Sequence, residues 1–218
     1  MSYLININDF KGRYRIAVSS FNTLKFQEYI DQVEQQIIVE DFGLSFYSDI
    51  EINPTKDKYQ DLIKSGYKEY LLGSIYFYYQ RDAFLSTSTG NVKINNSNSI
   101  NVPDAMNGAI AKDRYNLGVN YYNRGALDFL NDNAVKSFKI TSSLNLGNNL
   151  YQLSILEIDY LYVNDVIRIN NIDFTIQSID DIASTITIIS NVDLSGQKLI
   201  YDPFVNVYFD KKQLITPF

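Results

Sequence analysis

The sequence predicts an α+β fold, with an N-terminal helical bundle that carries an inserted polar hairpin, followed by a small C-terminal antiparallel β-barrel or sandwich. Before Asn131-Asp132-Asn133, apolar residues recur every three or four positions, which is the period of an amphipathic helix. After this point they alternate at every second position, as in half-buried strands. Because the helices all precede the strands, segregated layers are favoured over a parallel βαβ sheet with a ligand crevice at its switch point.

The N-terminal region is predicted to contain one brief helix and one long helix. Leu4–Ile7 is the expected extended lead-in, and Asn8 or Asp9 is the expected N-cap of the brief helix. Asn22 is a second capping residue, and the apolar residues that follow it keep the helical spacing. We expect Gly43 to end or bend this long helix.

The rest of the helical part is predicted to form a helical hairpin. After one short helical turn at Leu44–Tyr47, a new helix is expected to begin at Asn53-Pro54, with proline at its first position. Its apolar stripe continues from Tyr59 to Tyr79. The segment 86–102 is rich in Ser, Thr and Asn and is predicted to be a protruding hairpin, with a plain loop as the alternative. The last long helix is predicted to run from Pro103-Asp104 to Leu130.

Two pairs of glycines occur at the same interval in this hairpin. Gly66 and Gly73 are seven residues apart, and so are Gly118 and Gly125. Residues at this interval lie on one face of a helix, where the absence of a side chain allows a neighbouring helix to approach closely. A kink at Gly66 is the alternative.

The C-terminal part is predicted to contain short strands with tight turns. Asn170-Asn171 separates two alternating runs and is a good two-residue hairpin turn, because Asn tolerates positive φ. The sequence therefore divides into a helical domain at 1–133 and an all-β domain at 134–218. The tail Lys211–Phe218 has little to pack against within its own fold. The expected strands are 135–141, 151–155, 166–170, 172–179, 185–190 and 205–209.

The composition excludes several kinds of chemistry. The chain has no His and no Cys, so Ser-His-Asp and Cys-His catalysis and zinc sites of the usual nitrogen and sulfur type are excluded. The glycine patterns of dinucleotide and phosphate loops do not occur either. We therefore predict no catalytic residues, no cofactor-binding residues and no metal ligands.

Carboxylate chemistry is what the composition leaves open. The candidates for a carboxylate-dependent glycan hydrolase are Asp180-Asp181, Glu157 with Asp159, and Asp49 with Glu51. A turn at Asp180-Asp181 and a solvated face at Glu157 are the simpler interpretations. Asn131-Asp132-Asn133 lacks the glycine and the glutamate of a calcium loop, and a helix end is preferred there.

Charge and hydropathy bear on the surroundings of the protein. The net charge of −6 comes with basic residues that are scattered singly among acids, which argues against stable nucleic-acid binding. The first residues lack the features of a signal peptide, and the longest mostly apolar run is too short for a membrane helix. We expect a soluble protein that is made in the cytoplasm and makes no membrane contact.

Tyrosine clusters indicate a second apolar surface. Tyr76, Tyr78 and Tyr79 cannot all face one core, because neighbouring helical positions point about 100° apart. Some of these rings are expected to lie against a neighbouring subunit, although single exposed tyrosines are the alternative. The predicted subunit-interface residues are Tyr76, Tyr79, Val92, Ile94, Ile100, Tyr122, Leu214 and Phe218.

The order of these elements resembles the head–tail connector, or neck adaptor, proteins of tailed bacteriophages. The appended strand region and the Asn- and Tyr-rich composition look most like the ring proteins of crAss-like phages. The resemblance rests on a helix ending near Phe42-Gly43, the run Leu44–Ile50, a long helix from Tyr59 to Tyr79, the polar insert Ser86–Val102 and a returning helix from Tyr115 to Leu130.

The resemblance implies a virion protein that is not an enzyme and needs no cofactor. Such proteins form a homo-oligomeric ring, commonly dodecameric, beneath the portal protein in the neck of the particle. The ring extends the channel through which genomic DNA passes at ejection, and it docks further neck and tail proteins. The region 144–218 lies outside the minimal family pattern, and contact with a neighbouring ring is its expected role. A tail, baseplate or fibre-attachment protein is the alternative.

Overall fold

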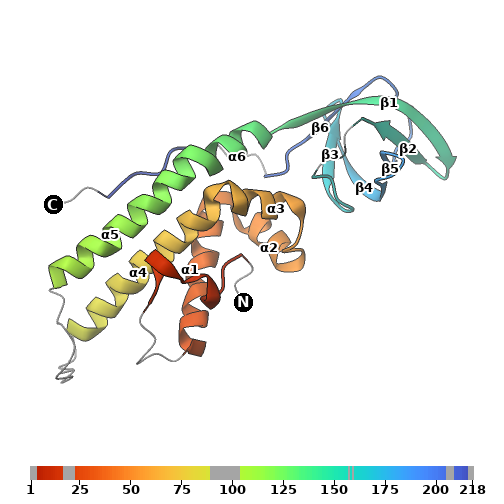
Figure 1. Cartoon of the computed structure of the whole chain (residues 1–218). Coiled ribbons are helices and arrows are strands. Elements are labelled where there is room, and N and C mark those ends of the chain that lie inside the picture. The colour runs from red at the N-terminus through yellow and green to blue at the C-terminus, as the bar shows by residue number, and fades with distance from the viewer. Residues whose placement is uncertain are drawn as a thin grey trace. The chain divides into compact units, whose positions relative to one another are not determined.

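The computed structural model describes residues 4–16, 23–88, 104–156, 158, 160–204 and 209–215. It confirms the α+β class, with helices first and then a closed antiparallel barrel (Figure 1). The chain forms two compact units. The helical unit comprises the described residues of 1–55, 59–130 and 208–218, and the barrel unit those of 56–58 and 131–207. The tail therefore belongs to the helical unit and not to the β domain at 134–218.

The predicted order of helices is confirmed, but two of the helices begin at other residues than predicted. The elements are η1 (Ile7–Asp9), η2 (Gly12–Tyr14), α1 (Thr23–Phe42), α2 (Leu44–Ile52), α3 (Asp57–Leu62), η3 (Ile63–Tyr67), α4 (Lys68–Ser88), α5 (Asp104–Tyr121), η4 (Tyr122–Ala126) and α6 (Leu127–Asn133). None of the helices among the described residues is long and apolar enough to span a membrane.

The prediction that a helix begins at Asn53-Pro54 is wrong. The N–H group of Asn53 donates to the carbonyl of Asp49 and closes the last turn of α2, so Pro54 follows a helix end and starts none. Proline is common at that position because it cannot continue a helix. The next helix, α3, begins at Asp57.

The N-terminal cap was also predicted at the wrong residues. Asn6 is the N-cap of η1: its side-chain oxygen accepts the N–H of Asn8 at 2.9 Å, and Asp9 returns a bond to the Asn6 N–H at 2.9 Å. The segment before it is held by Glu34 of α1. This carboxylate is fully buried and accepts the N–H of Ile5 at 2.7 Å.

Glycines bring α4 into backbone contact with α5, and η3 into backbone contact with η4. A Cβ on Gly73 would lie 2.6 Å from the Arg114 carbonyl oxygen, and one on Gly118 would lie 2.7 Å from the carbonyl oxygen of Glu69. A Cβ on Gly125 would lie 2.1 Å from the Ser65 carbonyl oxygen. Figure 1 shows the resulting antiparallel hairpin. The predicted close approach is confirmed.

The π-helical turns η3 and η4 face each other at one end of this hairpin. Gly66 in η3 has φ of 120°, and a Cβ there would meet the Tyr121 carbonyl oxygen at 2.8 Å. The kink and the close approach, which the sequence left as alternatives at this glycine, therefore both occur. A residue with a side chain would be strained by the backbone conformation and blocked by the neighbouring helix.

The predicted insert at 86–102 lies almost entirely outside the described residues. Its first positions are an exception, because α4 continues to Ser88 and the residues 86–88 are therefore helical. Helix α5 begins at Asp104, and α6 ends at Asn133. The predicted switch from helix to strand at 131–133 is confirmed.

The barrel closes in the order β1-β2-β5-β4-β3-β6, with every pair antiparallel. Its core is almost entirely aliphatic, and Ile140, Leu153, Ile176 and Ile186 are fully buried in it. The strands are β1 (Lys136–Gly147), β2 (Leu150–Ile155), β3 (Val166–Ile169), β4 (Ile172–Asp180), β5 (Thr185–Ile189) and β6 (Lys198–Tyr201).

Five of the six predicted strands are confirmed, and the structure has one strand, β6, that was not predicted. Strand β6 is Lys198–Tyr201, a run of four residues that buries Leu199 and Tyr201. The predicted strand at 205–209 falls mostly outside the described residues, and Phe209, its described member, is in no strand. The turn at Asn170-Asn171 is confirmed, with φ of 52° and 63°.

A cluster of polar contacts joins residues 56–58 to the rest of the barrel unit. The buried Lys58 donates to the carbonyl oxygen of Pro203 at 3.3 Å. Asp165 accepts the hydroxyl of Tyr201 at 2.6 Å and lies 3.9 Å from the Lys56 ammonium, which sits 4.4 Å above the ring of Tyr162. Tyr201 thus joins the last strand to the segment that contains Asp165.

Replacing Tyr201 with Phe is expected to lower the stability of the barrel unit by about 2 kcal/mol, because a hydrogen bond to a charged acceptor is lost in a partly buried place. The matched control is Tyr151→Phe, whose hydroxyl accepts from Asn145 at an exposed site and whose loss is expected to cost less than about 0.5 kcal/mol. Urea denaturation of the two variants is the measurement. Equal effects would contradict the role given to the Tyr201 hydroxyl.

Candidate functional site

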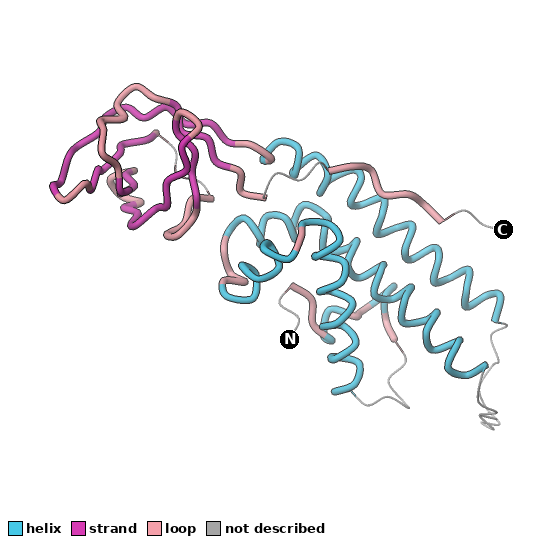
Figure 2. The backbone as a smooth tube through the Cα atoms, turned by 180° about the vertical axis from the view of Figure 1, so that it is seen from behind, coloured by secondary structure: helices cyan, strands magenta, loops and turns pink. Residues whose placement is uncertain are grey.

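The C-terminal part of the chain lies against the helical unit. Residues 209–215, here called the tail segment, have no regular secondary structure and run beside α5 (Figures 1 and 2). The ring of Phe209 packs 5.6 Å from that of Phe42, at the end of α1. The expectation that the tail has little to pack against within its own fold is therefore wrong.

Two asparagines hold the backbone of the tail segment. The side chain of Asn123 donates to the carbonyl oxygen of Lys212 at 3.0 Å and accepts its N–H at 2.9 Å. Asn116 does the same with Ile215, at 2.9 and 2.8 Å. An amide side chain has a donor and an acceptor side by side. Each asparagine therefore satisfies both the N–H and the carbonyl group of one tail residue. This pairing does not depend on which side chain the tail residue carries.

The spacing of the two asparagines explains why they act together. Asn116 and Asn123 are seven residues apart, or about two helical turns, and so lie on one face. The residues that they bind, Lys212 and Ile215, are three apart along an extended stretch. Gly118 and Gly125 occur at the same interval on this helix. One helix thus packs against α4 through its glycines and binds the tail through its asparagines.

Lys212 enters an acidic and aromatic pocket. Its ammonium forms an ion pair with Asp41 of α1, whose side chain is only 4% exposed. The same ammonium lies 5.4 Å from the ring centre of Tyr70 and 5.5 Å from that of Tyr122. Tyr67 donates its hydroxyl to the other oxygen of Asp41 at 3.0 Å. Asp41, Tyr70, Asn116, Tyr122 and Asn123 are here called the tail groove.

Burial governs the electrostatics of the tail groove. Removal from water raises the pKa of Asp41 above the ordinary carboxyl value, and the charge of Lys212 and the hydroxyl of Tyr67 oppose this rise. Burial and the nearby Asp41 carboxylate raise the pKa values of Tyr70 and Tyr122. The two rings therefore stay neutral, and their faces remain attractive to a cation.

The geometry of the tail groove is that of a binding site for an extended peptide. Asp210, Lys211, Gln213 and Leu214 are exposed, so only alternate parts of the tail segment are anchored. The asparagines recognise backbone, and the pocket recognises one lysine. Nothing in this set of side chains is arranged to activate a nucleophile or a water molecule.

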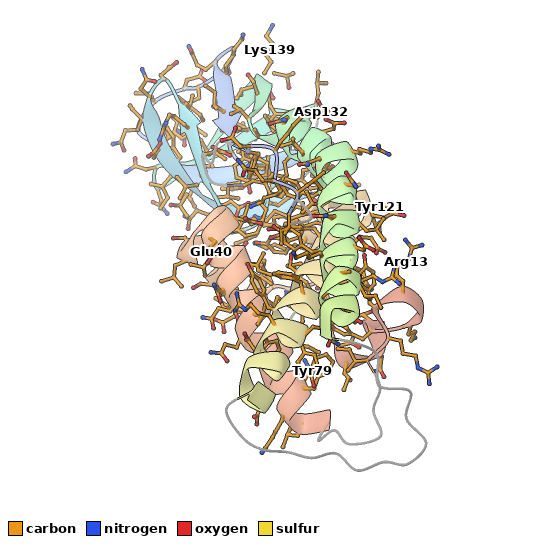
Figure 3. The ribbon with its side chains drawn as sticks, turned by 90° about the vertical axis from the view of Figure 1, so that its left-hand side faces the viewer. Arg13, Glu40, Tyr79, Tyr121, Asp132 and Lys139 are labelled. Carbon is orange, nitrogen blue, oxygen red and sulfur yellow. The ribbon has the colours of Figure 1, made fainter. Side chains whose placement is uncertain are left out.

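Two of the residues predicted to lie at a subunit interface are buried within the helical unit. Tyr76 is 9% exposed and Tyr122 is 2% exposed, so the expectation of an outer surface is wrong for them. For Tyr76 the reason is that α4 packs against α1 as well as α5. Tyr122, in η4, packs on the rings of Tyr67 and Tyr70. Tyr79, which is labelled in Figure 3, is half-buried, and its ring centre lies 5.0 Å from that of Phe26.

Of the other predicted interface residues, Leu214 is described and exposed, and the rest lie outside the described residues. Leu214 lies in the tail segment and is 50% exposed, so its side chain is accessible to a neighbour. Tyr121, which was not in the predicted set, is 43% exposed on α5 (Figure 3). Val92, Ile94, Ile100 and Phe218 lie outside the described residues.

The carboxylate candidates have structural explanations where they are described. Asp180 accepts the N–H groups of Ile182 and Ala183 and so forms the predicted turn. Asp49 accepts the hydroxyl of Tyr59 within the helical unit. Glu157 and Asp159 lie outside the described residues. In the part of the chain that the structure describes, no cluster of three or more potential metal ligands occurs.

The tail groove was not found from the sequence. The interval of seven between Asn116 and Asn123 was the available signal, but it does not say that the face they share binds another segment of the chain. Asp41 and Lys212 are 171 residues apart in the sequence, and no local pattern connects them. Comparisons of the chain with protein-family models, with curated proteins and with solved structures found no match.

Proposed function

We propose that this protein is a structural virion subunit that forms a homo-oligomeric ring in the neck of a tailed bacteriophage, between the portal protein and the tail. The ring extends the DNA channel and docks further neck or tail proteins. The protein performs no catalysis in this role and needs no cofactor.

The observation that carries the proposal is the α4–α5 hairpin. Backbone contacts at Gly73 and Gly118 hold α4 against α5, and those at Gly66 and Gly125 hold η3 against η4. The polar segment 89–103 connects α4 and α5 in the sequence. A ring subunit needs a closely packed element of this kind, because a closed ring requires two faces held at a fixed angle to each other. This order of helix, polar insert, returning helix and appended β domain is also the order on which the resemblance to neck adaptors rests.

The charge of the protein supports the same role. The net charge is −6, and a DNA channel benefits from a lining that does not hold phosphates. Passing DNA would then touch the ring without specific binding.

Exposed aliphatic side chains on the barrel unit support a docking role. Leu144 and Leu146 near the end of β1 are 57% and 52% exposed, and Ile189 at the end of β5 is 56% exposed. The β1–β2 turn and the end of β5 are adjacent, because Leu150 pairs with Ile189. A surface of this kind suits contact with another protein of the neck.

The test mixes the full chain with the portal protein and the neck proteins encoded beside it, and images the mixture by electron microscopy. Ring-shaped particles that contain the chain stacked on the portal are expected. The chain alone serves as the control, and a monomeric control is compatible with assembly on the portal. Portal particles to which the chain never binds would contradict the proposal.

A further inference from the structure

We infer that the tail groove is an extended-peptide site whose occupant in the assembled protein is the tail segment of a second copy of this chain. The inference goes beyond the proposed ring and does not depend on a phage role. It concerns which copy of the chain supplies residues 209–215 to the groove.

The contacts in the groove do not depend on how the tail segment is connected. Asn116 and Asn123 bind backbone groups, and Asp41, Tyr70 and Tyr122 surround one ammonium group. A tail segment from another copy would form each of these bonds with the same geometry. Exchange of an identical segment therefore loses no contact, which is why such exchange is a low-cost route to assembly.

The division of the chain favours exchange. The tail segment packs on the helical unit, but residues 131–204, which precede it, belong to the barrel unit. The chain thus leaves the helical unit, forms a complete barrel and only then supplies the occupant of the groove. An occupant attached to a different compact unit can be donated to another copy without opening the core of either unit.

The tail segment is also held by few groups. Of its side chains, those of Phe209, Lys212 and Ile215 are partly buried, and the others are exposed. Segments with few buried contacts open locally, at less than the free energy of global unfolding. The groove can therefore release its own tail while the helical unit stays folded.

Charge complementarity selects the occupant. The pocket combines the buried Asp41 carboxylate with two aromatic rings that lie near the bound ammonium, and it suits a single lysine side chain. The asparagines require an extended backbone that presents one residue to Asn123 and the third residue after it to Asn116. The sequence Lys212-Gln213-Leu214-Ile215 meets both requirements, and every copy of the chain carries it.

A pair of charge-reversed full chains tests this inference. In Asp41→Lys the groove repels its own Lys212, and in Lys212→Asp the tail is repelled by its own Asp41. In a mixture, the Lys212 tail of the first variant fits the Asp41 groove of the second, and the reverse match also holds. Native mass spectrometry is expected to show a one-to-one complex with a dissociation constant at least about tenfold below that of either homodimer, a difference of about 1.4 kcal/mol.

The double variant Asp41→Lys/Lys212→Asp is the matched control. It restores the attraction within one chain and is expected to form no more complex with either single variant than the wild type does. Circular dichroism checks that the variants are folded. If both single variants are folded and their mixture forms no more complex than each alone, the inference is overturned.

A second measurement uses the unaltered groove and decides the question if a charge-reversed variant fails to fold. The exposed Leu214 is replaced by the photoreactive residue p-benzoylphenylalanine in full chains that are either unlabelled or labelled with ¹⁵N. The two are mixed at about 1 mM, which is comparable with the effective concentration of a segment on a short tether. Crosslinks from the tail to α5 that join labelled with unlabelled chains are expected, and crosslinks confined to single chains would overturn the inference.

Discussion

Gly125→Ala is expected to lower the free energy of unfolding of the helical unit by about 3 kcal/mol, the upper part of the usual range for overpacking. A Cβ at this position would lie 2.1 Å from the carbonyl oxygen of Ser65. This oxygen belongs to the backbone next to the strained Gly66, so it cannot move aside as the end of a flexible side chain would. The two π-helical turns would have to separate. Urea denaturation followed by circular dichroism at the helical wavelength measures the loss.

Gly108→Ala is the matched control for this prediction. Gly108 lies in α5, which leads directly into the η4 turn that contains Gly125, but a Cβ at Gly108 would meet nothing within 4 Å. Alanine favours a helix over glycine by about 1 kcal/mol, so this variant is expected to be slightly more stable than the wild type. If both variants were stabilised, the backbone contact between η3 and η4 would not be what holds this end of the hairpin together.

Lys212→Met is expected to lower the free energy of unfolding at neutral pH by about 3 kcal/mol, because removal of one partner leaves a buried charge without compensation. Asp41 would keep only the Tyr67 hydroxyl among the groups that lower its pKa here. The methionine retains the length of the side chain, so the loss reports on the charge. Lys211→Met is the control, because Lys211 is exposed beside it, and its replacement is expected to change stability by less than about 0.5 kcal/mol.

The pH dependence of this loss follows from Asp41. The carboxyl of Asp41 has a raised pKa in the folded chain, and Lys212 lowers it from the value that burial alone would give. Without Lys212 the folded pKa rises further. A carboxyl whose pKa is raised by folding binds its proton more tightly in the folded state, so its contribution to stability falls as pH rises through the folded pKa.

The difference between wild type and Lys212→Met should therefore be smallest in acid. It should grow as pH rises from the Asp41 pKa of the wild type to that of the variant, and stay constant above. Urea denaturation at a series of pH values, with the Asp41 pKa measured by ¹³C NMR of the carboxyl, checks this. A loss that is independent of pH would mean that the ammonium of Lys212 does not stabilise the Asp41 carboxylate.

Much of the fold followed from local patterns in the sequence. The helical period up to Leu130, the alternation after Asn133 and the paired glycines are properties of short segments, and the structure confirms each of them. The errors arose where a neighbour decides the outcome. Strand β6 is only four residues long and exists because β1 and β3 lie on either side of it.

The interface prediction failed for a related reason. The adjacent Tyr78 and Tyr79 point about 100° apart on the helix, so the cluster of Tyr76, Tyr78 and Tyr79 cannot all face one core. The sequence does not say whether the second apolar surface is another subunit or another helix. Here α1 supplies it, because Phe26 and Tyr29 pack on the ring of Tyr79. The tail groove was missed because it joins residues that are far apart in the chain, such as Asp41 and Lys212.

Localisation of the protein in intact particles tests the proposed function most directly. Under the proposed function the chain is encoded by a tailed phage, and particles of that phage would be imaged by electron cryomicroscopy, with a labelled copy of the protein to mark its position. The account predicts a closed ring of copies around the DNA channel, directly below the portal. Label at the distal end of the tail would point instead to a baseplate or fibre-attachment protein, and particles that lack the chain would contradict any structural role in the virion.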